Sequence, residues 1–138
     1  MAVGFSVDAL WYQVGSGAFM QSFFSTITVN LEGGRWGSRF PYIMIKLYYD
    51  EIIPEDVDKA LHELRIISEE LKNFPPDKVV WDVDDRSLQP PWGDYISDEI
   101  TDLSNYFVTS QGKDLIETLT KALETSKEWG YPIKIESI

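Results

Sequence analysis

Residues 54–76 read PEDVDKALHELRIISEELKNFPP, and this stretch carries the clearest structural signal in the chain. Pro54 suits the first turn of a helix, and the acidic side chains that follow it favour a helix N-terminus. Pro75-Pro76 prevents the helix from continuing. Apolar residues recur every three or four positions, as an amphipathic helix requires, at Val57, Ala60, Leu61, Leu64, Ile67 and Leu71. The stretch therefore predicts a helix that packs one face on a core.

The residues before this helix predict two strands and two more helices. Apolar side chains alternate over residues 3–7, which is the period of a half-buried strand, and residues 10–14 predict a second short strand. A Gly-Ser-Gly turn follows, in which Ser16 is expected to cap a helix. Apolar residues at helical spacing extend that helix over residues 19–31, and the same spacing predicts a helix over residues 40–48.

The residues after the central helix predict two more strands and one more helix. Along residues 78–83, Val79, Trp81 and Val83 should point to a face that the helices cover, and Asp82 to the opposite face. The rest of the chain predicts, in order, a loop over residues 84–97, a short helical turn over 98–104 capped by Ser97, and an extended segment over 106–109. A last helix follows Ser110, carries apolar residues from Leu115 to Trp129 and ends at Gly130, and a strand covers residues 133–136.

These elements predict an α+β fold, with a small, mostly antiparallel sheet covered by three or four helices. The length of 138 residues favours a single domain over residues 1–138, and a hydrophobic share of 43% is enough for a core. The N-terminus lacks a basic region followed by an apolar stretch, so we expect a cytoplasmic protein with no membrane association.

The net charge of −11 is concentrated in two windows. Residues 50–58 contain five carboxylates and no cation, and residues 77–102 contain eight carboxylates against Lys78 and Arg86. The rest of the chain is neutral. Such a surface repels phosphate backbones and anionic membranes, so direct binding to nucleic acid is not expected. A basic protein partner is the electrostatic complement, and solubility alone is the alternative interpretation.

Few residues offer catalytic or metal-binding chemistry. The absence of cysteine excludes disulfides, Cys-based zinc sites and thiol nucleophiles, and His62 is the only histidine. It lies near the polar flank of the central helix, where a surface role is the simpler interpretation. The run Asp82-Val83-Asp84-Asp85 lacks the glycine and the distal glutamate of a calcium-binding loop. No cofactor or metal is therefore expected.

Two Trp-Gly pairs place large aromatic side chains in predicted loops, Trp36-Gly37 and Trp92-Gly93. A rigid tryptophan in a loop is typical of a binding hot spot, but it can equally pack beneath its own loop as part of the core. Both interpretations stay open for Trp36 and Trp92. The residues expected to face a partner are Asp82, Asp84, Asp85, Trp92, Asp94 and Asp102.

Six stretches of the chain form a recognisable series: LWY (10–12), SFFSTI (22–27), WGSRFP (36–41), FPPDKVVWD (74–82), QPPWGD (89–94) and ITDLSNYFVTS (100–110). In this order, across nearly the whole chain, they resemble the immunity protein 70 family of bacterial polymorphic-toxin systems. The chain departs from the family in the 45–70 helix and the C-terminal strand.

The resemblance implies a cytoplasmic antitoxin, without enzymatic activity, that binds and neutralises a cognate toxin. The acidic composition agrees with a toxin whose binding surface is basic, such as a nuclease. Two other functions stay open: a small cytosolic enzyme that uses the carboxylates of residues 82–102, and a scaffold that self-associates through its loop aromatics. An adjacent toxin gene would favour the first function, and turnover that depends on one carboxylate would favour the second.

Overall fold

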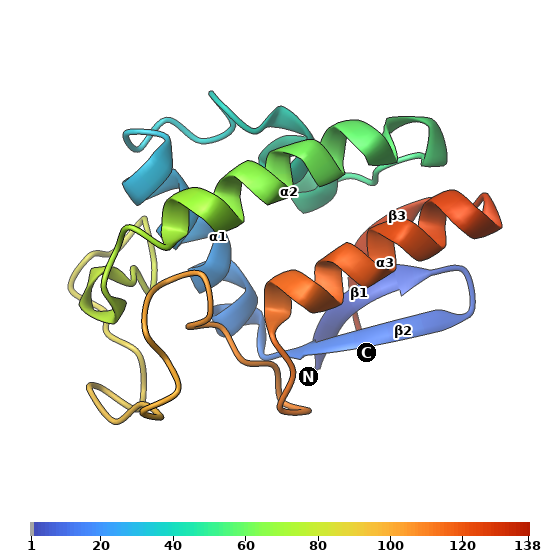
Figure 1. Cartoon of the computed structure of the whole chain (residues 1–138). Coiled ribbons are helices and arrows are strands. Elements are labelled where there is room, and N and C mark those ends of the chain that lie inside the picture. The colour runs from blue at the N-terminus through green and yellow to red at the C-terminus, as the bar shows by residue number, and fades with distance from the viewer. Residues whose placement is uncertain (1) are drawn as a thin grey trace.

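The computed structural model describes residues 2–138, which form a three-stranded antiparallel sheet and three α-helices (Figure 1). The strands are β1 (Val3–Val7), β2 (Leu10–Gly15) and β3 (Ile133–Ser137), in the order β2-β1-β3. Because β1 pairs with both neighbours, the first and last segments of the chain lie side by side. The prediction of an α+β fold with a small antiparallel sheet is confirmed.

The three α-helices are α1 (Gly17–Leu31), α2 (Val57–Leu71) and α3 (Leu115–Trp129). Ser16 caps α1 by accepting a hydrogen bond from the backbone N–H of Phe19, and Gly130 ends α3 in a left-handed conformation, both as predicted. Shorter turns are a π-helix, η1 (Tyr42–Leu47), and two 3₁₀ turns, η2 (Pro54–Asp56) and η3 (Pro76–Lys78). The helix predicted over residues 40–48 is thus a π-helix, and its apolar side chains still face the core.

Helix α1 lies at the centre of the structure and is buried on nearly every side. Phe23, Phe24 and Ile27 have no exposed surface, and Ser25 and Thr26 are equally buried. Helices α2 and α3 run side by side, and α3 also packs on the sheet (Figure 1). A helix surrounded in this way has polar side chains in the interior, and these need hydrogen-bond partners.

The prediction of a strand over residues 78–83 is wrong. This segment runs irregularly along α1, and side chains of that helix satisfy its backbone. The Thr26 hydroxyl accepts from the Val80 N–H at 3.0 Å and donates to the Val80 carbonyl at 3.2 Å. Ser22 also donates to the Val80 carbonyl, and Ser25 accepts from the Val83 N–H. A helix supplies only side-chain groups, so no β-ladder forms here.

The orientation predicted for this segment is wrong for Val80, although Val79 and Trp81 do pack against the hydrophobic core. Val80 is the buried residue, with 5% of its surface exposed, whereas Val79, Trp81 and Val83 are half-buried. Asp82 is half-buried and accepts a hydrogen bond from the Gln21 amide at 3.4 Å. Strand alternation does not apply because the hydroxyls of α1 bind Val80 and so direct it inward.

The short helical turn predicted over residues 98–104 is wrong as well. Two separate turns occupy this stretch, and Ser97 accepts a hydrogen bond from the Glu99 N–H in the first of them. The Asn105 side chain accepts from the backbone N–H groups of Thr101 and Asp102. These side-chain bonds replace the backbone bonds of a helix.

Replacing Thr26 by valine should destabilise the protein by about 1–3 kcal/mol, because the buried Val80 N–H loses its acceptor. Thr28→Val is a matched control on the same helix. The Thr28 hydroxyl is buried and has no hydrogen-bond partner among residues 2–138, so its removal should be neutral or stabilising. Denaturant unfolding measures both variants. Equal free energies of unfolding for the two variants would contradict this account of residues 78–83.

Candidate functional site

The segment between α2 and α3 carries all six residues that the sequence analysis assigned to a partner surface. It wraps the lower end of α1 in Figure 1, where it is drawn in yellow and orange. The six residues lie on three turns: Asp82, Asp84 and Asp85 on the first, Trp92 and Asp94 on the second, and Asp102 on the third. They therefore form a strip along one segment and do not converge on a single point.

Three of the carboxylates organise their own turns. Asp82 accepts a hydrogen bond from the Asp84 N–H at 2.9 Å, and Asp85 accepts one from the Ser87 N–H at 3.1 Å. Asp102 accepts from the Ser104 N–H at 2.8 Å. Burial acts to raise the pKa of Asp102, but the hydrogen bonds from Ser104 and Thr101 outweigh it and bring the pKa below its ordinary value. These bonds hold the charges in defined positions.

The negative charge of this segment is not neutralised by ion pairs. Five side-chain ion pairs occur within residues 2–138, and none of them includes a carboxylate of residues 77–102. Asp84, Asp85 and Asp94 are exposed, whereas Asp82 and Asp102 are half-buried. The negative electrostatic potential of such unpaired carboxylates extends beyond the protein surface.

The first turn also lies close to aromatic residues that follow η1. The pKa of the Tyr48 phenol is raised, first by burial and then by the neighbouring Tyr49, Asp84 and Asp82. Tyr48 packs edge-to-face against Tyr49 at 4.9 Å between ring centroids. The structure thus brings the acidic turn next to an aromatic pair at least 33 residues earlier in the chain, which the sequence analysis did not anticipate.

Trp92 packs beneath its own loop. Its indole N–H donates to the Tyr106 hydroxyl at 2.9 Å, and its ring contacts Trp81 and Phe19 at centroid distances of 5.4 and 6.2 Å. Trp36 is held in the same way, with its indole N–H on the Met44 carbonyl and its ring stacked on Phe24. Of the two interpretations left open for each tryptophan, packing against the core describes both side chains, which remain half-buried.

The sequence analysis missed two buried glutamates that organise irregular backbone, and the first of them, Glu32, holds the WGSRFP segment. Glu32, 5% exposed, accepts hydrogen bonds from the backbone N–H groups of Gly37, Arg39 and Phe40 at 2.9–3.1 Å. A Cβ on Gly37 would lie 2.4 Å from the Ile45 side chain, and its φ of 78° also requires glycine. The motif therefore encodes a tight loop wrapped around one carboxylate.

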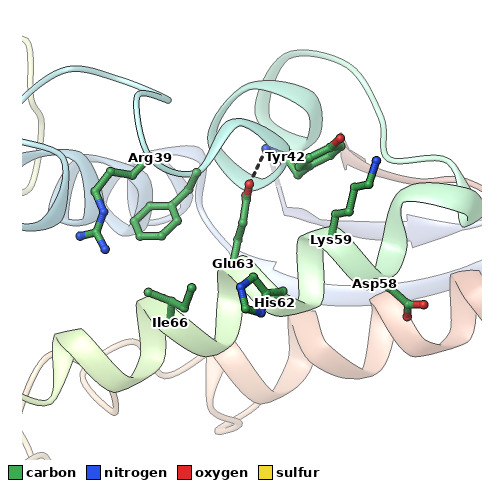
Figure 2. Close-up of a pocket in the computed structure, with 8 residues that line it drawn as sticks. Arg39, Tyr42, Asp58, Lys59, His62, Glu63 and Ile66 are labelled. Carbon is green, nitrogen blue, oxygen red and sulfur yellow. Dashed lines mark hydrogen bonds between the residues drawn. The ribbon is translucent and has the colours of Figure 1, made fainter.

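Glu63 performs the same function for η1. It extends from α2 to the start of the π-helix (Figure 2), where it accepts from the N–H groups of Ile43 at 2.9 Å and Tyr42 at 3.3 Å. Burial raises the pKa of this carboxyl, and the two backbone hydrogen bonds act in the opposite direction. A sequence signal existed, because Glu63 interrupts the apolar stripe of α2 between Ala60 and Ile67.

The hollow beside Glu63 measures about 600 Å³ (Figure 2). Its walls are formed by Arg39, Phe40, Tyr42, Asp58, Lys59, His62, Glu63 and Ile66. Arg39 makes a bidentate pair with Glu70 at 2.7–2.8 Å, and Asp58 pairs with Lys127 at 2.9 Å. Lys59 lies over the Tyr42 ring, 5.5 Å from its centroid. These charged side chains already have partners within the fold, and His62 is exposed on α2.

Across residues 2–138, no three His, Asp or Glu side chains lie close enough to hold a metal ion. Over the same residues, no helix has both the length and the apolar character needed to cross a bilayer.

Replacing Trp92 by alanine should destabilise the protein by about 2–4 kcal/mol, because the loop loses its packing on Trp81 and Phe19. Trp92→Phe should destabilise the protein less, because it keeps most of the aromatic contact although it loses the hydrogen bond to Tyr106. Denaturant unfolding of both variants tests this. Wild-type stability in Trp92→Ala would show that the loop does not depend on the indole.

Comparison with known proteins gives one match. The family model described as "Immunity protein 70" matches residues 5–135, nearly the whole chain. No curated protein and no solved structure is significantly similar to the chain. The match covers the last three residues of β1, both glutamate-centred segments, the acidic loop and the first three residues of β3. The chain therefore belongs to the immunity protein 70 family.

Proposed function

We propose that this protein neutralises a cognate toxin by binding it in a fixed molar ratio, without any turnover of its own. The observation that carries the proposal is membership of an immunity protein family over residues 5–135. The hollow beside Glu63 is consistent with the absence of turnover, because its charged side chains already interact with other groups of the fold. These side chains are Arg39, Asp58, Lys59 and Glu63. We place the complex in the cytoplasm, where a toxin would reach its target in the cell.

The partner surface in this proposal is the strip that carries Asp82, Asp84, Asp85, Asp94 and Asp102. Its charges lack ion-pair partners, and hydrogen bonds hold three of them in place. A toxin that acts on nucleic acid needs a basic cleft, and an acidic inhibitor accelerates its approach to such a cleft and competes with the phosphate backbone. A basic toxin domain, and a nuclease in particular, fits this surface best.

A titration of toxin activity tests the proposal. Increasing amounts of the protein are added to its cognate toxin domain, to be identified by co-expression of adjacent reading frames, and residual activity is measured at each ratio. We expect a linear decrease that ends at a fixed molar ratio, because each bound copy blocks one toxin. Complete protection at a small fraction of that ratio, developing with time, would instead indicate enzymatic modification of the toxin.

Converting Asp82, Asp84 and Asp85 to asparagine should slow association with the toxin by roughly 3- to 10-fold and change dissociation less. Asparagine keeps the side-chain oxygens that accept hydrogen bonds in these turns, so the fold should persist. The association rate of the wild type should also decrease more steeply with salt. Stopped-flow association at several salt concentrations measures both effects.

The matched control for this triple variant is Asp50→Asn with Glu51→Gln and Glu55→Gln. It changes the net charge by the same amount within the other acidic window. We expect its association rate to stay close to that of the wild type at physiological salt. Equal slowing of both triple variants would mean that total charge, and not the strip, controls the approach of the toxin.

A further inference from the structure

The second and third turns of the segment between α2 and α3 combine exposed apolar side chains with uncompensated charge. Residues 87–112 contain four carboxylates and no lysine, arginine or histidine. Within the same stretch, the exposed fractions are 92% for Tyr95, 46% for Leu88 and 45% for Val108. Exposed aromatic and aliphatic side chains beside an acidic rim are typical of a protein-binding surface.

A groove of about 280 Å³ is lined by two of these side chains, Tyr95 and Val108. Phe19 and Trp92 line it from the core side, and Tyr95, Ile96, Ile100 and Val108 complete its apolar walls. Tyr106 lines it as well and accepts the indole N–H of Trp92 at 2.9 Å. Because core aromatics line it and a hydrogen bond joins two of them, the groove is already formed before any partner binds.

Tyr95 is the most exposed of the large apolar side chains within residues 2–138. Its backbone N–H donates to the Trp92 carbonyl at 3.0 Å, which fixes the chain at that point, whereas the side chain contributes almost nothing to the folded core. Tyrosine has only two side-chain torsions to order on binding, and its ring offers a large contact area. These properties suit an anchor at an interface.

We propose that this groove is the toxin-binding hot spot, and that it accepts an apolar side chain of the toxin flanked by lysine or arginine. The inference rests on the proposed function and names where binding energy is concentrated. Asp94, which follows the loop Trp-Gly pair, and the exposed Asp98 and Glu99 would face the toxin's cations, while Tyr95 covers the apolar side chain. The acidic turn at Asp82, Asp84 and Asp85 then acts mainly on the rate of approach.

The negative charge around the groove favours a basic toxin surface over a nucleic acid, an anionic membrane or a second copy of this chain. A nucleic acid or an anionic membrane would place phosphates against four carboxylates. A second copy of this chain, docked through the same groove, would bring the same carboxylates face to face, and like charges oppose such an interface. A basic protein surface is the complement that remains.

The test measures binding of Tyr95→Ala to an inactive form of the cognate toxin domain that the titration uses. We expect the dissociation constant to rise on the order of 10- to 30-fold, mainly through faster dissociation, because a hot-spot side chain is lost. The melting temperature should stay unchanged, since the ring is 92% exposed. Val108→Asp, which places a charge on another apolar residue that lines the groove, should weaken binding similarly. Tyr131→Ala removes an exposed tyrosine just after α3, at the other end of the molecule in Figure 1, and should bind like the wild type.

Each outcome decides between the two proposals. If the wild type neutralises the toxin and Tyr95→Ala binds it equally well, the groove is not the hot spot and the proposed function stands. If the wild type fails to bind or neutralise the toxin, the proposed function itself fails. Sedimentation of the protein alone tests whether the groove instead binds a second copy of the chain. A dimer that dissociates in Tyr95→Ala would assign the groove to self-association and overturn the inference.

Discussion

Hydrogen bonds from the side chains of α1 to an irregular backbone segment are the interaction on which the candidate site depends. Thr26 and Ser22 bind Val80 from a helix that is buried on nearly every side. Without them, α1 would carry unpaired hydroxyls in the interior, and residues 78–83 would carry unpaired backbone groups. Because both needs are met by the same bonds, the segment is tied to the core although it forms no regular secondary structure. The acidic loop begins where this attachment ends.

The same principle recurs with charged groups at the other end of α1. Glu32, the C-cap residue of α1, binds backbone N–H groups of the loop that follows it. Glu63 on α2 binds the first backbone N–H groups of the π-helix η1, as in a helix cap. The acidic residues of this chain thus serve two purposes. The buried carboxylates of Glu32 and Glu63 accept hydrogen bonds from backbone N–H groups. Most carboxylates of residues 77–102 remain at the surface without cationic partners. The net charge of −11 is therefore not a uniform property of the molecule.

This arrangement suits a protein that acts by binding. Aromatic side chains of the core, among them Phe19 and Trp92, support the acidic turns from below, so little conformational entropy remains to be lost when a partner docks. Strong binding by a small protein requires such preorganisation together with a complementary field, and a rigid acidic face meets both requirements for a basic toxin. The family assignment and the physical character of the surface lead to the same proposal by independent routes.

The sequence alone determined the regular elements, because each has a local cause. Alternation over residues 3–7, the Ser16 cap, the apolar stripe of α2 and the glycine at 130 act within a few residues of where they occur. The motifs of the loops were also sufficient to suggest the family. For residues 78–83, local alternation indicated a strand, but the hydroxyls of α1 were closer partners than any strand. The places of Trp92, Glu32 and the groove around Tyr95 were likewise decided by tertiary structure, since their partners lie in other segments of the chain and no local pattern records them.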